Sequence, residues 1–379
     1  MLFWPKQETV LVDRGAPKAP HFLMAQDLFA RKGSRELFIK KIFSAKAGIR
    51  RRGPVILCPG IATNANLFRM DDQGGFLSLG NNRSFATYLA SEGFTVYCFH
   101  PGYAQRVYNR YVVRHCRQSM FYGKMRTTPP TLDFVELVDR EVPMVIERVR
   151  RDSGSSNISW VGYSLGGMMM YTYLAKTLDA TVRNVVTIGS PITLHQIFVR
   201  IIPLINWITR ALGFEEKSFV GTVTQNFVPI TRAIRKIPGP VLRFNPIASP
   251  LLWNPFNMSG KAAKTLLGKV VEPVPNSLQK SISTMISQGL ACKQYGPELV
   301  KSMGYICKNK AKFLFFYGGA DVIAPPDTVL LAHEIITPND SNNLIGVNAA
   351  GHVDLMIGEN AREKVWLPTG KWLMENTSR

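Results

Sequence analysis

The stretch from Asn157 to Leu174, NISWVGYSLGGMMMYTYL, constrains the fold more than any other part of the chain. Apolar and β-branched residues lead into Gly162-Tyr163-Ser164-Leu165-Gly166, and a helical pattern follows at once. This is the sequence pattern of a strand, a sharp turn and a helix, with a serine at the strained position of the turn. Glycines two residues before and after that serine avoid collisions across the turn. The pattern predicts that Ser164 is a nucleophile at the tip of a sheet; the alternative is a plain strand-to-helix turn.

Short apolar runs and helical patterns alternate along most of the chain. The runs that predict strands are Leu37–Phe43, Pro54–Cys58, Phe94–Phe99, the residues before Gly162, Val185–Ile188, Lys312–Tyr317 and Asn343–Val347. The patterns that predict helices include Asn82–Ser91, Thr131–Arg151, with two helices meeting near Pro143, and Ala361–Met374. Such alternation predicts an α/β fold with a mainly parallel central sheet and helices on both faces.

The alternation divides the chain into four parts. Residues 1–53 are predicted to form an N-terminal arm, with residues 1–30 on the surface, followed by the first strands; residues 54–191 form the first half of the core. Residues 192–290 are apolar, basic and interrupted by prolines, and are expected to form an inserted helical cap or lid. Residues 291–379 complete the core. Within the cap, residues 192–214 either adsorb at a membrane interface or pack on the core.

The chain is strongly basic, with a formal net charge of +20 over 379 residues. Such a charge suits nucleic acid, an anionic membrane surface or acidic ligands. Arg106–Arg126 holds six basic residues and no acidic ones among aromatic residues. A loop over a sheet edge is favoured there over a site for single-stranded nucleic acid, because no nucleic-acid-binding motif accompanies it. We therefore expect peripheral contact with anionic membrane and no nucleic-acid partner.

The sequence indicates neither a cofactor nor an export signal. Its five cysteines form no C-x-x-C pair, and no metal or organic cofactor is expected. The first residues lack a signal-peptide core, and no run of 18 uncharged apolar residues occurs. These features predict a cytoplasmic protein that contacts membranes peripherally.

Three residues far apart in the sequence form a candidate catalytic triad. Ser164, Asp321 and His352 occur in this order, and each follows an apolar strand. A serine hydroxyl needs a histidine to take its proton and a carboxylate to orient that histidine. Asp327 and Asp354 are the other candidate acids; Asp327 could cap a helix, and Asp354 could order the histidine loop. The N–H of Leu165 and an N–H of the Gly60-Ile61 turn are candidate donors to an oxyanion.

Several of these stretches resemble the acid lipase family of α/β hydrolases, which includes gastric and lysosomal lipases. The matching stretches are PVILCPGIATNANLF, NNRSFATYLASEGFTVYCFHPGYAQR, WVGYSLGGMMMYTYLA, NMSGKAAKTLL, QKSISTMISQGLACKQYG, FLFFYGGADVIAPP and GHVDLMIG. The resemblance implies the α/β-hydrolase fold and the triad above, with Ile61 and Leu165 as oxyanion donors. It also implies a cap and lid over an acyl-chain pocket. Polyhydroxyalkanoate synthases are similar more distantly, but they carry a cysteine in place of the serine.

These features together predict a serine carboxylic-ester hydrolase, a lipase or esterase of lipid metabolism, acting on acyl esters with an apolar chain. One alternative is an acyltransferase, related to polyhydroxyalkanoate synthases, that uses the same acyl-enzyme. The other is a catalytically silent protein that binds membrane surfaces. Acyl-chain length, head group, lid motion and oligomeric state stay open.

Overall fold

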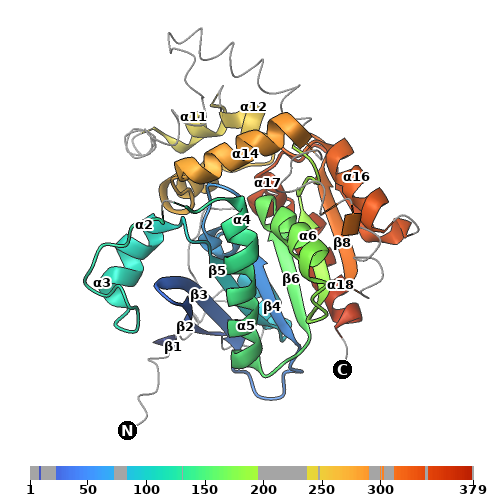
Figure 1. The fold of residues 1–379 in the computed structure, drawn as a ribbon. Helices are drawn as coiled ribbons and strands as arrows, with labels where there is room; N and C mark the ends of the chain where they lie inside the picture. The colour runs from blue at the N-terminus through green and yellow to red at the C-terminus, as the bar shows by residue number, and fades with distance from the viewer. Residues whose placement is uncertain are drawn as a thin grey trace.

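A nine-stranded sheet forms the centre of the described part of the protein (Figure 1). The computed structural model describes residues 8–9, 23–71, 83–129, 131–194, 237–245, 248–289, 299, 301–302, 311–337 and 340–377. The strand order is β1-β2-β3-β5-β4-β6-β7-β8-β9. The strands are β1 Glu8–Thr9, β2 Leu23–Lys32, β3 Arg35–Ser44, β4 Pro54–Cys58, β5 Thr95–His100, β6 Ile158–Tyr163, β7 Val182–Ile188, β8 Lys312–Gly318 and β9 Leu344–Val347.

The six strands from β5 to β9 in this order are all parallel to one another. The central strands β4 and β6 are buried at every position, as expected for strands that are covered on both faces. Their carboxyl ends meet at one edge of the sheet, which we call the carboxyl edge. The predicted α/β fold with a mainly parallel sheet is confirmed.

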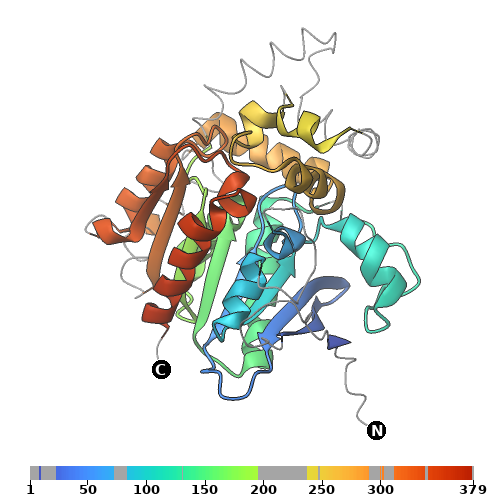
Figure 2. The ribbon, with the colours of Figure 1, turned by 180° about the vertical axis from the view of Figure 1, so that it is seen from behind.

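Helices pack on both faces of the sheet, and each face buries its own apolar cluster. Figure 1 shows α5 (Val142–Ser153) and α6 (Leu165–Thr177) in front of the strands. Figure 2 shows α1 (Phe85–Ser91) and α18 (Leu367–Asn376) on the opposite face. The α16 helix (Pro326–Ile336) packs with α5 and α6. Ser84 caps α1 through a reciprocal pair of hydrogen bonds with Thr87.

The predicted junction at Pro143 is a change of helix type within one helical segment. The α4 helix (Phe134–Glu136) continues through a π-helical turn, Leu137–Glu141, into α5. Pro143 occupies the first turn of α5, where its missing N–H costs little. A second π-helical turn, Arg362–Trp366, leads into α18, again just before a proline.

The predicted surface arm of residues 1–30 is wrong from Leu23 onward. Leu23–Lys32 forms β2, which pairs antiparallel with β3 through a turn at Gly33-Ser34. Two pairs of opposite charge lie directly across this hairpin, Asp27 with Lys40 and Arg31 with Glu36. These cross-strand ion pairs stabilise a strand that contains polar residues.

The expected loop over Arg106–Arg126 is wrong in its first half. The segment begins with α2 (Gln105–Val107), a π-helical turn (Tyr108–Val112) and α3 (Val113–His115), and then continues as turns.

The predicted cap lies partly outside the described residues, which omit 195–236, and its boundaries stay a prediction. Its described helices are α11 (Gly239–Arg243), α12 (Ala248–Leu252), α13 (Gly260–Thr265), which continues into a π-helical turn (Leu266–Val270), and α14 (Asn276–Gln288). Figure 1 shows α11, α12 and α14 across the carboxyl edge. In the described ranges, no helix has the length and apolarity needed to cross a membrane.

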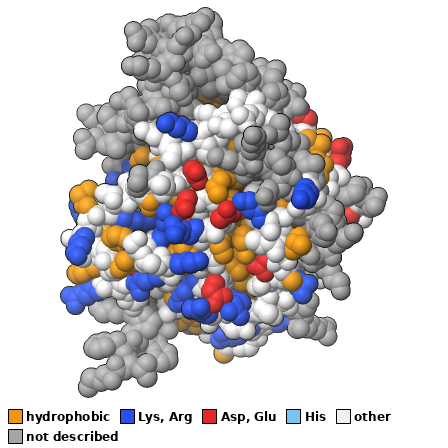
Figure 3. Space-filling view, in the orientation of Figure 1, with side chains coloured by type: hydrophobic (Ala, Val, Ile, Leu, Met, Phe, Trp, Pro, Cys, Tyr) orange, Lys and Arg blue, Asp and Glu red, His pale blue; other side chains and the backbone are white. Residues whose placement is uncertain are grey.

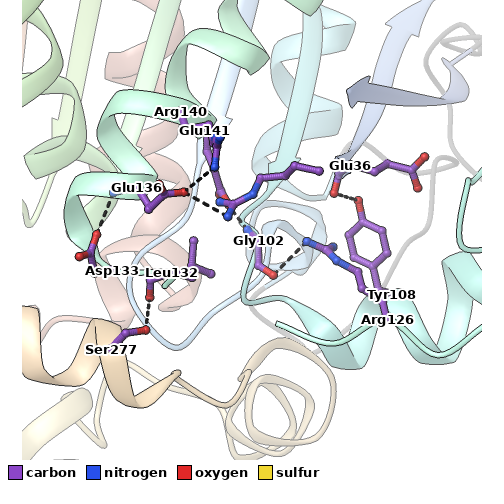
Figure 4. A network of polar contacts seen from close by, with 11 residues as sticks. Glu36, Gly102, Tyr108, Arg126, Leu132, Asp133, Glu136, Arg140, Glu141 and Ser277 are labelled. Carbon is purple, nitrogen blue, oxygen red and sulfur yellow. Dashed lines mark hydrogen bonds and ion pairs between the residues drawn. The ribbon is translucent and has the colours of Figure 1, made fainter. Parts of the chain in front are cut away.

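A fully buried carboxylate, Glu141, joins the π-helical turn between α4 and α5 to β3 and to the loop after β5 (Figure 4). It accepts hydrogen bonds from the N–H of Gly102 at 2.8 Å and from Arg35 Nη1 at 3.2 Å. Burial raises the pKa of Glu141 to about 7, although the Gly102 N–H and the nearby Arg35 and Arg126 oppose the shift. The carboxylate is therefore held at a desolvation cost that its partners offset only in part.

Because folding raises the pKa of Glu141 from 4.5 to about 7, ionisation of this group destabilises the folded state. Relative to the ionised group, protonated Glu141 contributes about 3 kcal/mol to the free energy of unfolding. This contribution is fully present below pH ~4.5 and is lost as the pH rises through ~7. We expect the Glu141→Gln variant to show a flatter decline in the free energy of unfolding between pH 4.5 and 7, measured by urea denaturation. The exposed Glu334→Gln on α16 is the control and should keep the wild-type slope. Parallel slopes for Glu141→Gln and wild type would contradict the assignment.

Candidate active site

Ser164 lies in the sharp turn between β6 and α6, at the carboxyl edge. Its backbone has φ 52° and ψ −119°, a conformation that non-glycine residues rarely adopt. The turn is so tight that a Cβ at Gly162 would lie 2.5 Å from the backbone of Gly166 and Gly167. The predicted need for glycine at 162 is therefore a direct steric requirement. The N–H of Ser164 donates to the carbonyl of Ile188 on β7 at 2.9 Å, which fixes the turn to the sheet.

The structure brings Ser164, Asp321 and His352 into one continuous chain of hydrogen bonds. His352 Nε2 lies 2.9 Å from Ser164 Oγ, and His352 Nδ1 lies 2.7 Å from Asp321 Oδ2. All three residues are buried, with 6%, 2% and 5% of Ser164, Asp321 and His352 exposed. An ionised carboxylate at Nδ1 selects the tautomer with its proton on Nδ1, so that Nε2 can accept the serine proton. This is the geometry that an activated serine needs.

The loops after β8 and β9 hold the acid and the histidine together. The N–H of Ala320 donates to the carbonyl of Ala350 at 2.9 Å, and that of Gly319 to Val347 at 2.9 Å. Asp321 Oδ1 accepts the N–H groups of Ile323 and Ala324 at 2.9 and 2.8 Å. One carboxylate oxygen is thus held by the backbone, which leaves the other for the histidine.

The two other candidate acids lie elsewhere. Asp327 is in the first turn of α16, after the N-cap residue Pro325, so its predicted role as a cap is wrong. Asp354, at the start of α17 (Asp354–Ile357), accepts a hydrogen bond from the backbone of Gly351, so it orders the loop that carries His352, as predicted. Its Oδ2 accepts from Asn257 Nδ2 at 2.8 Å, and burial raises its pKa.

Two other nucleophilic or basic side chains near the sheet are buried away from the chain of hydrogen bonds. Cys58 is buried within β4, and burial raises the pKa of its thiol well above the usual value. His100 stacks on Phe38 at the end of β5, and burial lowers its pKa. Among the described residues, no group of His, Cys, Asp and Glu side chains is arranged to hold a metal ion.

The turn after β4 lies against Ser164, as the assignment of oxyanion donors requires. A Cβ at Gly60 would lie 2.9 Å from the Cβ of Ser164. The carbonyl of Gly60 accepts hydrogen bonds from Tyr103 Oη at 2.7 Å and Thr63 Oγ1 at 2.8 Å. Because the Gly60-Ile61 peptide is trans, its N–H, which belongs to Ile61, points opposite to that anchored carbonyl. Tyr103 and Thr63 therefore fix the direction of the Ile61 N–H.

Leu165, the first residue of α6, contributes the second N–H group. The first N–H groups of a helix have no partner within the helix. In the part of the chain that the structure describes, no protein acceptor binds the N–H of Ile61 or that of Leu165.

Glu272, in the last part of the predicted cap, anchors the turn after β4 and was not predicted from the sequence. Its N–H donates to the carbonyl of Ala62 at 2.8 Å, and its Oε1 accepts from Asn64 Nδ2 at 2.7 Å. Its Oε2 accepts the N–H of Arg106 at 2.8 Å. Burial raises the pKa of Glu272 to about 7. The only signal in the sequence was a lone acidic residue in a basic, apolar region.

This arrangement of strands, helices and loops is the α/β-hydrolase fold. Residues 53–211 match the model of the alpha/beta hydrolase fold family. Several solved structures are similar over nearly the whole chain. A candidate lipase from Sulfolobus solfataricus is 15% identical, covers 97% of this chain and 99% of its own, and has a TM-score of 0.57. A soluble variant of monoglyceride lipase from Saccharomyces cerevisiae, solved with a substrate analogue, is 15% identical, covers 94% and 96%, and has a TM-score of 0.53.

A serine hydrolase from Cycloclasticus zankles is 12% identical, covers 92% of this chain and 98% of its own, and has a TM-score of 0.50. At such identities the likeness shows the fold. No curated protein matches the sequence.

Replacing Gly162 by alanine tests the steric requirement at the Ser164 turn. The new Cβ would meet backbone atoms at 2.5 Å, which cannot move without displacing the turn. We expect the free energy of unfolding to fall by about 1–3 kcal/mol, the usual cost of overpacking. Gly53→Ala is the control, because its nearest neighbour is the side-chain methyl of Thr377 at 3.2 Å. Equal stability of the two variants in urea denaturation would contradict the tight turn.

Proposed function

We propose that this protein is a serine carboxylic-ester hydrolase, with Ser164 as nucleophile, His352 as general base and Asp321 as the acid that orients the histidine. The observation that carries the proposal is the pair of hydrogen bonds that joins the three side chains, 2.9 Å from His352 Nε2 to Ser164 Oγ and 2.7 Å from His352 Nδ1 to Asp321 Oδ2. The α/β-hydrolase fold and the lipases and serine hydrolase among similar structures support it.

In the proposed reaction, Ser164 Oγ attacks the ester carbonyl while His352 Nε2 takes the hydroxyl proton. The carbonyl oxygen becomes an oxyanion, which the N–H groups of Ile61 and Leu165 stabilise. His352 then donates its proton to the leaving alcohol, and an acyl-enzyme on Ser164 is formed. Water, activated by the same histidine, attacks the acyl carbon and releases the acid. The Asp321 carboxylate stabilises the imidazolium in both steps.

We further propose that the acyl chain of the substrate is apolar. The resemblance to acid lipases supports this substrate class. The resembling stretches include Asn257-Met258-Ser259, and Asn257 contacts both ends of α17, the helix that follows His352: its side-chain amide contacts Asp354, and its carbonyl accepts the N–H of Glu359 at 2.8 Å. The segment that resembles acid lipases thus supports the helix that follows the proposed base, His352.

Removing the hydroxyl of Ser164 tests the nucleophile. Wild-type protein should hydrolyse p-nitrophenyl esters and react with a fluorophosphonate probe, and peptide mapping should find the probe on Ser164. Ser164→Ala should lose labelling and about 10⁴-fold or more of the turnover, since this side chain forms the acyl-enzyme. Ser190→Ala, a buried serine after β7, is the control and should keep labelling. Hydrolysis that survives Ser164→Ala unchanged would reject the proposed function.

Removing the hydroxyl of Tyr103 tests the orientation of the Ile61 N–H. Tyr103→Phe loses the 2.7 Å hydrogen bond to the Gly60 carbonyl but keeps the ring. We expect kcat for p-nitrophenyl esters to fall about tenfold with little change in KM, because only oxyanion stabilisation weakens; loss of a whole donor costs about 10²–10³. Tyr173→Phe, whose hydroxyl binds Asp179, is the control. A rise in KM at constant kcat would instead assign Tyr103 to substrate binding.

A further inference from the structure

The chain between β5 and α4 leaves the sheet and projects on the side where strands β1, β2 and β3 lie. Figures 1 and 2 both show this excursion, with α2 and α3, at the side of the molecule. We call residues 110–125 the basic tip. The proposed ester chemistry assigns this tip no role.

The basic tip is anchored by Glu36, a fully buried carboxylate on β3. Glu36 accepts hydrogen bonds from Ser119 Oγ at 2.6 Å, from the N–H of Met120 at 2.9 Å and from Arg31 Nε at 2.7 Å. The backbone carbonyl of Glu36 accepts a hydrogen bond from Tyr108 Oη at 2.9 Å (Figure 4). Ser119 and Met120, within the basic tip, are thus fixed to β3.

Arg126 closes the base of the excursion. Its guanidinium lies 3.7 Å from the centre of the Tyr108 ring, and its Nη2 donates to the carbonyl of Gly102 at 3.0 Å (Figure 4). The N–H of Arg126 donates to Asn109 Oδ1 at 2.9 Å, and Asn109 Nδ2 donates back to the carbonyl of Arg126 at 3.2 Å. The two ends of the tip are therefore held next to each other.

A backbone fixed in this way presents basic and apolar side chains together to solvent. Its exposed basic residues are Arg110, Arg114, Arg117 and Lys124, and no acidic residue occurs between positions 106 and 126. Its exposed apolar residues are Met125, with 81% of its surface exposed, Met120 with 45% and Tyr122 with 44%. Lys32, the last residue of β2, is also exposed. In Figure 3, Lys and Arg side chains gather on the left and lower part of the face, with hydrophobic side chains among them.

We propose that the basic tip docks on an anionic phospholipid surface. Lys and Arg side chains would lie at the phosphate level, where each contributes attraction to anionic lipid. Met120, Tyr122 and Met125 would enter the boundary between headgroups and acyl chains, where apolar area leaves water and a tyrosine ring is favoured. A nucleic acid would use the same cations, but it offers no apolar layer for the two thioether side chains. The apolar side chains therefore favour a membrane.

The first test measures co-sedimentation of the full chain with vesicles of phosphatidylcholine, alone or mixed with phosphatidylserine. We expect binding to the mixed vesicles that weakens as salt rises. Arg117→Glu with Lys124→Glu should lower the partition coefficient about tenfold or more, since each cation at the surface accounts for roughly a fivefold change. The control, Lys364→Glu with Lys371→Glu, changes the net charge equally at exposed positions near and within α18. Equal losses in both double variants would overturn the assignment to the tip.

The second test separates membrane from nucleic acid. Met120→Ser with Met125→Ser should weaken vesicle binding about threefold or more, while Leu367→Ser, 40% exposed on α18, should leave it unchanged. Binding of a single-stranded oligonucleotide is measured by fluorescence anisotropy in parallel. Oligonucleotide binding that depends on Arg117 and Lys124, with no vesicle binding, would overturn the proposal. Thermal unfolding of each variant checks that it is folded, and neither readout depends on ester hydrolysis.

Discussion

The left-handed backbone of Ser164 is the constraint on which the rest of the site depends. A non-glycine residue in such a conformation costs about 1–3 kcal/mol and persists only where its surroundings enforce it. Here β6 is buried between β4 and β7, and the helix after the turn packs on the same sheet. The turn at Ser164 is therefore strained locally and held by the most buried part of the core. Packing of the buried core thus offsets the backbone strain that places the Ser164 hydroxyl at the carboxyl edge of the sheet.

A parallel sheet then brings the remaining groups to that hydroxyl with little further cost. Strands β4, β6, β8 and β9 all end at the same edge, so their following loops meet there whatever their separation in sequence. The loops still need fixed conformations, and buried carboxylates supply them. Glu141 holds the loop after β5, Glu272 holds the turn after β4, and Asp354 holds the loop that carries His352 through the backbone of Gly351. Burial raises the pKa of each of these three carboxyl groups, so the order of the site is maintained against a desolvation cost.

Local sequence signals predicted the fold and the three residues of the hydrogen-bonded chain, but of the anchors around them they predicted only Asp354. Strand β4 is continuously apolar, and Ser164, Asp321 and His352 each follow an apolar run. Their positions directly after strands were therefore enough to predict that they lie at one edge of the sheet. Strand β2 was missed because Gln26 and Asp27 interrupt its apolar pattern, and its stability comes from β3 across the hairpin. The Gly33-Ser34 pair between the two strands was the available signal. Glu272 and Tyr103 act through contacts with a turn that lies far from them in sequence, which no local pattern reports.

The arginines between Arg106 and Arg126 show how one stretch of sequence serves two physical roles. Arg106 and Arg126 lie at its ends and turn inward, where their guanidinium groups bind backbone carbonyls and, for Arg126, the face of Tyr108. The basic residues between them face solvent. Had the charge served solubility alone, it would not need a buried Glu36 to fix the backbone that carries it, nor exposed methionines beside it. Exposing apolar side chains on this fixed, basic surface is unfavourable in water. The exposed apolar area is stabilised only where these side chains leave water. The structure of the excursion thus argues for contact with a surface that is both anionic and apolar.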